Sequence, residues 1–256
     1  MEHITSRSNR LLVHLRKLGT SGAYRRERGT FLCDGGKLLE EALGWGAEIE
    51  ALLCAEGTVP PPLPPTVRAA SVPWDVLRSV SPLETPQDIL FSVKYPARPL
   101  PEVWTGGMVL DGVQDPGNVG TILRTADAFG APGLLLLPGC ADPFGPKAVR
   151  ASMGAVFRLG AWSVSLEQLG AILRRSALPL IGAALGEHSY EVETMPRPAM
   201  TAVGSEGRGL SGAVLALCDG TVRIPMRQRC ESLNAAIAAA VLLWEQRPRA
   251  FGKEQG

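Results

Sequence analysis

Apolar and polar positions in the first part of the chain alternate between helical and strand-like spacing. Apolar residues recurring at helical intervals predict helices at residues 6–18, 37–43 and 73–80. Short apolar runs predict strands at residues 30–33, 49–54 and 89–93. The proline-rich stretch 60–65 predicts a loop, because proline fixes φ and lacks an N–H donor. Together these elements predict a small α/β domain over residues 1–96.

The pattern changes after residues 97–107, a stretch rich in proline and glycine that is interpreted as a linker. Beyond it, apolar runs predict strands at residues 108–113, 133–137, 179–184, 201–204 and 221–224. Helices are predicted at residues 119–129 and 232–245. The leucine run at 133–137 is typical of a strand buried on both faces of a parallel sheet. Residues 108–256 are therefore predicted to form an α/β domain with a mostly parallel sheet.

The last predicted helix, 232–245, is apolar on nearly every side, and Asn234 is its polar break. A helix without a polar face has to be buried all round. Protein core and a subunit interface together would bury it, so the helix composition agrees with a homodimer.

Composition and charge narrow the classes of function. The chain has 256 residues, of which 45% are hydrophobic and 20% are charged, as in ordinary two-domain soluble proteins. A net charge of +1 gives no overall attraction for nucleic acid, so an RNA site has to come from a local patch. One such patch is residues 1–29, where seven arginines and lysines face two glutamates. This patch is either a helix face exposed to solvent or an arm that contacts the phosphates of a nucleic acid.

Cysteine and histidine are too scattered to suggest a metal or redox site. The five cysteines form no CxxC pair and the three histidines are isolated, so we expect neither disulfides, nor zinc, nor a catalytic histidine. A reducing cytoplasm is the expected compartment. No membrane span is expected, because the longest apolar stretch, 235–244, falls short of the roughly 20 residues that a bilayer requires.

Three short segments place glycine or proline beside polar side chains next to apolar runs. They are LDGVQDPGNVGTILR at 110–124, VGSEGRGL at 203–210 and IPMRQRCESLNAA at 224–236. In α/β proteins, ligands bind where buried strands open into such loops. Loops rich in glycine and poor in lysine suit a neutral or cationic ligand approached by backbone groups. These segments indicate an enzyme.

The three segments resemble the signature motifs of the SpoU/TrmH family in the SPOUT superfamily of knotted RNA methyltransferases. The resemblance rests on Asn118, Gly120 and Arg124, on Gly204-Ser205-Glu206 with Gly209, and on 224–226 leading to 232–234. Residues 147–155 also resemble the family's segment between the first two motifs. Residues 1–96 resemble, more loosely, the RNA-binding domain similar to ribosomal protein L30e that precedes many of these catalytic domains.

The resemblance implies methyl transfer from S-adenosylmethionine to a ribose 2′-hydroxyl of RNA, without a metal. Ribosomal RNA is the favoured substrate and transfer RNA the alternative. A homodimer and a deep trefoil knot in the last third of the chain are implied as well. The cofactor-binding positions implied by the motifs are Val203, Gly204, Ser205, Gly209, Ile224, Met226 and Leu233.

The same motifs imply five catalytic residues, namely Asn118, Arg124, Glu206, Ser232 and Asn234. General-base action by Arg124 conflicts with the permanent positive charge of a guanidinium, so we expect it to position RNA and stabilise the forming alkoxide. Whether Arg124 also acts as the general base stays an open question at this point. Asn118 and Ser232 also fit helix N-caps. RNA contacts are expected from Arg7, Arg10, Arg25, Arg26, Arg28 and Arg150.

One position departs from the family pattern, and two rival functions compete with the one that the resemblance implies. Gln228 stands where the family usually has a glycine, so the turn after Met226 is expected to differ in shape. A catalytically inactive RNA-binding homologue is one rival, although all five catalytic residues are present. A nicotinamide-dependent oxidoreductase would need GxGxxG after the first strand of its domain, and the loop at 114–118 does not supply it.

Overall fold

The computed structural model describes residues 1–186, 189–227 and 232–248. Its chain forms two compact units. The first contains Met1–Ala97 with Phe144–Phe157, and the second contains Arg98–Pro143 with Arg158–Gly256. Phe144–Phe157 therefore packs with the first unit, whereas the sequence placed it in the catalytic domain.

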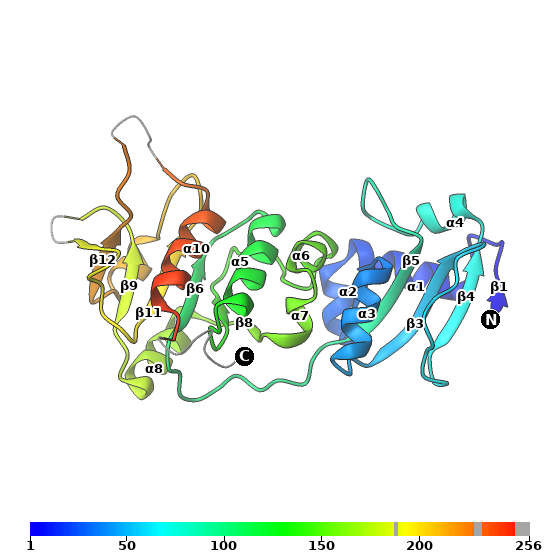
Figure 1. Cartoon of the computed structure of the whole chain (residues 1–256), viewed down its shortest axis with the longest axis horizontal. Helices are drawn as coiled ribbons and strands as arrows, with labels where there is room; N and C mark the ends of the chain where they lie inside the picture. Colours follow the sequence, from blue (N-terminus) through cyan, green and yellow to red (C-terminus); the bar gives the residue numbers. More distant parts are fainter. Residues whose placement is uncertain (187–188, 228–231, 249–256) are drawn as a thin grey trace, which may run out of the picture. The chain divides into compact units, whose positions relative to one another are not determined.

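The first unit is built on a five-stranded mixed sheet (Figure 1). The strands, in spatial order, are β1 (Glu2–His3), β4 (Arg68–Val72), β3 (Ile49–Ala55), β5 (Ile89–Lys94) and β2 (Thr30–Asp34). β5 runs antiparallel to both β3 and β2, and the other pairs are parallel. The helices are α1 (Arg10–Thr20), α2 (Gly22–Arg28), α3 (Gly36–Gly44), α4 (Trp74–Arg78) and α6 (Pro146–Ser152). α7 (Ala155–Arg158) ends at the boundary with the second unit.

Strand β2 is buried along its whole length because it is covered on both faces. Leu32 packs into a core with four leucines of α1, while the ring of Phe31 contacts the rings of Phe144 and Phe157. The continuous apolar run at 30–33 reflects this double burial. The predicted helix at 6–18 starts later, at Arg10, because the side chain of Asn9 accepts a hydrogen bond from Leu11 N and caps it there.

The second unit is built on a seven-stranded sheet in which every recorded pair is parallel, which confirms the predicted α/β class. Its spatial order is β10 (Ser189–Glu191), β12 (Gly220–Arg223), β9 (Leu180–Ala183), β11 (Met200–Gly204), β6 (Gly107–Asp111), β7 (Leu134–Leu136) and β8 (Ala161–Ser163). The helices are α5 (Pro116–Ala128), α8 (Leu166–Ser176), α9 (Gly212–Leu215) and α10 (Ala235–Gln246). The trefoil knot stays a prediction.

The order of the strands brings the three motifs to one edge of this sheet. β6 pairs with β11 in a register that sets Asp111 beside Gly204, so the loops after both strands leave from neighbouring points. β9 and β12 follow on the side of β11 away from β6, and α10 packs on α5 and β11 (Figure 1). The carboxyl edge of a parallel sheet is where α/β proteins bind ligands.

Helix α10 is buried on one side only. Ala235, Ala236, Ala239, Leu242 and Leu243 face the core, whereas Ile237 is 53% exposed and Trp244 is 47% exposed. Among the described residues the helix is therefore not buried all round. Trp244 is partly covered by the Phe129 ring and the Arg247 guanidinium, whereas Ile237 faces outward. Among the described residues, no helix combines the length and the apolar character that crossing a bilayer demands.

Candidate active site

One residue from each of the three motifs joins a continuous chain of hydrogen bonds. Asn118 Nδ2 donates to Glu206 Oε1, and Asn234 Nδ2 donates to Asn118 Oδ1 at 3.1 Å. Asn118 lies 88 positions from Glu206 and 116 positions from Asn234 in the sequence. The fold therefore brings three distant polar residues into direct contact.

The side chain of Asn118 can reach both partners because another residue caps its helix. Asp115 is the N-cap of α5, and its Oδ1 accepts a hydrogen bond from Asn118 N at 2.8 Å. The expectation that Asn118 itself caps the helix was wrong, since Asp115 followed by Pro116 is the stronger start signal. Asn118 instead lies in the first turn, where its amide is left for Glu206 and Asn234.

Asn234 uses the two ends of its amide in different ways. Its Oδ1 accepts hydrogen bonds from Ala236 N at 2.9 Å and Ile237 N at 3.3 Å, so it is the N-cap of α10. Its Nδ2 points to Asn118. Ser232 was the expected cap of this helix, and that expectation was wrong, because the helix begins after Asn234.

Glu206 lies in a tight turn that opens from the end of β11. Ser205 N donates to Gly209 O at 3.2 Å, and Gly209 N donates to Ser205 O at 2.8 Å, which closes the turn. A Cβ at Gly204 would lie 2.0 Å from the carbonyl carbon of Gly209, so only glycine permits this close approach. The Glu206 side chain is exposed and is held by Asn118.

A cavity of about 260 Å³ lies beside this turn, at the carboxyl ends of β9, β11 and β12. All seven positions that the motifs implied for the cofactor line it, namely Val203, Gly204, Ser205, Gly209, Ile224, Met226 and Leu233. Glu206 and Ser232 line it too. The cavity wall thus combines backbone, aliphatic side chains, hydroxyls and one carboxylate.

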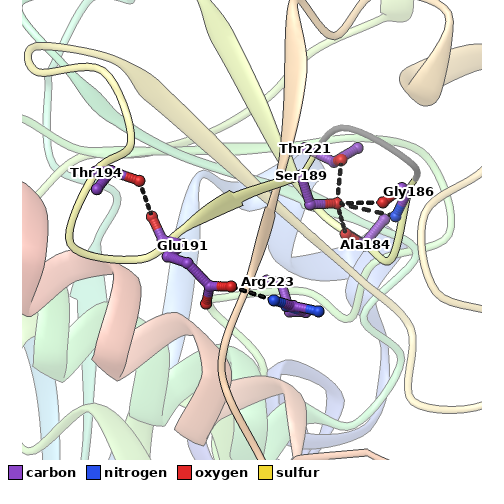
Figure 2. A network of polar contacts seen from close by, with 7 residues as sticks. All are labelled: Ala184, Gly186, Ser189, Glu191, Thr194, Thr221 and Arg223. Carbon is purple, nitrogen blue, oxygen red and sulfur yellow. Dashed lines mark hydrogen bonds and ion pairs between the residues drawn. The ribbon is translucent and has the colours of Figure 1, made fainter.

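A polar network joins β10 to β12, the strand whose carboxyl end lines the cavity (Figure 2). The hydroxyls of Ser189 and Thr221 are 2.7 Å apart, and Gly186 N donates to Ser189 Oγ at 2.9 Å. At the far end of the strands, Arg223 forms an ion pair with Glu191 (Figure 2). Arg223 also lines the cavity, and its charge is offset by this partner. Sequence reasoning missed the pair, because only strand pairing brings the two residues together.

Arg124 is set apart from the other predicted catalytic residues. It is exposed on α5, does not line the cavity, and forms no hydrogen bond or ion pair with any residue of the described ranges. The structure brings Asn118, Glu206 and Asn234 together through hydrogen bonds, and places Ser232 on the cavity wall. Gln228 lies outside the described residues.

The predicted RNA-binding arginines fall into three groups. Arg10, Arg26 and Arg28 are exposed on α1 and α2. Arg7 pairs with Asp75 at 2.6 Å, and Arg150 donates to Thr85 O at 2.8 Å.

Arg25 is only 6% exposed, and its guanidinium donates to Leu18 O at 2.7 Å. The expectation that Arg25 contacts RNA was therefore wrong, because this side chain satisfies a carbonyl of α1.

Cys140 and Cys218 are the described cysteines of the second unit. Burial raises the pKa of the Cys140 thiol, and it raises the pKa of Cys218 to about 11, so both thiols are protonated near neutral pH. Across the described ranges, no group of three or more His, Cys, Asp or Glu side chains has the arrangement of a metal site.

Comparison with known families agrees with the motifs and the sheet. The model of the SpoU rRNA Methylase family matches residues 107–244, more than half of the chain. This chain belongs to the SpoU rRNA methylase family. A second family model, of the MRM3-like substrate binding domain, matches residues 9–90 in the first unit.

Similar proteins cover both units. The 23S rRNA (guanosine(2553)-2′-O)-methyltransferase RlmP of Bacillus subtilis is 32% identical over 250 residues, which span 96% of this chain and 100% of RlmP. The structure of an AdoMet-bound rRNA methyltransferase from Sinorhizobium meliloti has a TM-score of 0.83 at 28% identity, over 96% of this chain and 97% of that one. The SpoU methyltransferase AviRb from Streptomyces viridochromogenes, in complex with AdoMet, has a TM-score of 0.77 at 32% identity, over 93% and 97% of the two chains.

Proposed function

We propose that this chain transfers a methyl group from S-adenosylmethionine (AdoMet) to a ribose 2′-hydroxyl of ribosomal RNA. The observation that carries the proposal is the hydrogen-bond chain Glu206–Asn118–Asn234 beside a cavity lined by all seven implied cofactor positions. Membership of the SpoU family supports it, as do the AdoMet-bound structures of similar fold. Ribosomal rather than transfer RNA is favoured because RlmP, similar over its whole length, is a 23S rRNA methyltransferase.

The cavity fits AdoMet in its chemistry. AdoMet has a neutral base, which suits backbone groups and the apolar side chains of Ile224, Met226 and Leu233. It also has a sulfonium cation, which suits the Glu206 carboxylate on the same wall. When bound, AdoMet supplies an electrophilic methyl group.

The residues around the cavity are suited to holding the acceptor hydroxyl. Glu206 Oε1 accepts the hydrogen bond from Asn118 Nδ2, whereas Glu206 Oε2 forms no hydrogen bond with a described residue. In the proposed mechanism this oxygen accepts the hydrogen bond of the ribose 2′-hydroxyl and then its proton. Alignment of bound reactants contributes on the order of 7–11 kcal/mol in favourable intramolecular cases.

Arg124 acts on the RNA in this proposal. Its exposed guanidinium is permanently charged, so it binds a phosphate beside the reacting ribose and stabilises the forming alkoxide. Arg10, Arg26 and Arg28 add phosphate contacts from the first unit. A cytoplasmic location belongs to the same proposal, since Cys33, Cys54, Cys140 and Cys218 are free thiols.

The proposal includes a homodimer formed through α10. Ile237, Ala240, Val241 and Trp244 recur at spacings of three and four residues, and all are at least partly exposed. Such a stripe makes one side of a helix apolar, and a second copy of the helix would cover it. Because Asn234 caps α10 and α5 packs on it, this interface would lie beside the site.

Gly204→Ala should weaken AdoMet binding at least about tenfold, or ~1.4 kcal/mol, in isothermal titration of the full-length protein. The added Cβ would lie 2.0 Å from the Gly209 carbonyl carbon, which forces open the turn that lines the cavity. Gly207→Ala is the matched control, because Gly207 lines the same cavity but an added Cβ meets nothing within 4 Å. Equal affinities for the two variants would contradict this assignment of the cavity.

Arg124→Ala should slow methyl transfer to ribosomal RNA about 100-fold or more, a loss typical of removing one charge-stabilising donor. The rate is measured at saturating RNA and AdoMet, so that lost binding is separated from lost chemistry. Arg124→Lys should also be poor, because an ammonium cannot replace the planar fork of a guanidinium. Arg175→Ala, at another exposed arginine of the second unit, should keep its rate. Near-normal turnover by Arg124→Ala would remove the arginine from the mechanism.

Ile237→Glu should convert a dimer into a monomer in light scattering at micromolar concentration. The substitution places a charge in the proposed apolar interface, where it has no partner. Val59→Glu is the control, because Val59 is 90% exposed in the first unit and lies outside the stripe. A monomeric wild type, or a variant that still dimerises, would reject an interface through α10.

A further inference from the structure

A second cavity, of about 630 Å³, lies within the first unit and takes no part in the proposed methyl transfer. Lys37 and Glu40 line it from α3, and Trp45 follows at the end of that helix. Arg150 and Met153 line it from α6 and its C-cap. The cavity is larger than the one at the motifs, which has about 260 Å³.

Two large apolar side chains on this wall face solvent. Trp45 is 60% exposed and Met153 is 50% exposed. The backbone of Met153 has a positive φ of 49°, a conformation that is uncommon for residues other than glycine. Exposed aromatic and methionine side chains that line one cavity indicate a surface that binds a flat apolar partner.

The polar side of the cavity contains a buried carboxylate that is hydrogen-bonded to two loop residues. Asp34 is 7% exposed, and its two oxygens accept hydrogen bonds from Gln87 N at 2.9 Å and Ser81 Oγ at 3.0 Å. These bonds fix the loop that carries Gln87. Burial raises the pKa of the Asp34 carboxyl, and both hydrogen bonds oppose this shift.

The side chain of Gln87 lies against the backbone of Gly35. A Cβ at Gly35 would lie 2.2 Å from Gln87 Oε1, so the carboxamide reaches the Gly35 backbone, and the φ of 116° at Gly35 favours glycine there. The carboxamide forms no hydrogen bond with any residue in the described part of the chain. Its amino group, with two N–H donors, and its carbonyl acceptor therefore lie at the cavity without a hydrogen-bond partner among the described residues.

We propose that this cavity binds one unpaired base of the RNA substrate, stacked on Trp45 and recognised at its edge by Gln87. Unpaired bases are recognised in this way, by aromatic faces together with side chains that read the base edge. The inference rests on the proposed function, because it takes the substrate to be RNA.

The charges at the cavity favour a base over a phosphate. The acidic residues Asp34, Glu40 and Glu41 outnumber the cationic residues Lys37 and Arg150. Carboxylates repel phosphate but accept hydrogen bonds from the exocyclic amino groups of adenine, cytosine and guanine. Uracil lacks such a group, so the cavity should prefer the other three bases.

The test is binding of short, fluorescently labelled, unpaired RNAs to the full-length protein, followed by anisotropy. Each RNA is a run of uridines in which one central residue is adenosine, cytidine or guanosine, and an all-uridine RNA serves as reference. Wild type should bind the three substituted RNAs more tightly than the reference. Trp45→Ala should weaken their binding at least about fivefold, since a stacked base commonly contributes that much or more.

Matched variants distinguish an effect at the cavity from the general effect of removing an exposed aromatic or amide side chain. Trp74→Ala should bind like wild type, because Trp74 is 47% exposed on α4 and does not line the cavity. Gln87→Leu should reduce the preference for adenosine, cytidine and guanosine over uridine, while the base still stacks on Trp45. If Trp45→Ala binds all four RNAs as wild type does, or if wild type shows no preference over uridine, the inference is overturned.

A failure of the cavity can be told apart from a failure of the proposed function. Methyl transfer to ribosomal RNA by wild type tests the proposed function and does not depend on the short RNAs. An active enzyme whose Trp45→Ala variant keeps full RNA affinity would reject the base-binding cavity alone. Absence of methyl transfer would reject the proposed function alone, and base-selective binding that depends on Trp45 would still support the cavity.

Discussion

The site depends on the direct contact of Asn118 with Glu206 and Asn234. These residues come from three segments, and two amides and a carboxylate connect them. The contact requires β6 beside β11, since Asn118 follows β6 and Glu206 follows β11. It also requires α10 on α5, because Asn234 and Asn118 lie at the N-terminal ends of these helices. The strand order and the packing of one helix pair therefore set the geometry of the site.

Helix capping and site geometry are coupled through the same side chains. Asp115 caps α5, which leaves the Asn118 amide available to its two partners. Asn234 caps α10 with its oxygen and contacts Asn118 with its nitrogen. A shift of either helix would carry its own cap along but would break the hydrogen bond between Asn234 and Asn118. The glycine turn 204–209 adds a third constraint, because its backbone pairing fixes where Glu206 emerges.

The sequence was most informative where local chemistry decides the structure. Apolar runs predicted the parallel sheet, and the resemblance of three short segments to the SpoU/TrmH motifs implied the residues that line the cavity. Contacts between distant residues were not predictable in this way. The burial of Arg25 depends on how α2 turns back on α1, and β1 is recognisable only through its pairing with β4. The position of Arg124 outside the cavity depends on which face of α5 is exposed.

The central claim is that Asn118 holds the carboxylate of Glu206 in place for methyl transfer. The most direct test is the single-turnover rate of Asn118→Ala on ribosomal RNA at saturating RNA and AdoMet, with AdoMet affinity measured in parallel. The account predicts a rate about 100-fold lower, as for loss of one positioned polar group, and unchanged AdoMet affinity because Asn118 does not line the cavity. A rate close to that of wild type, or a defect confined to AdoMet binding, would contradict it.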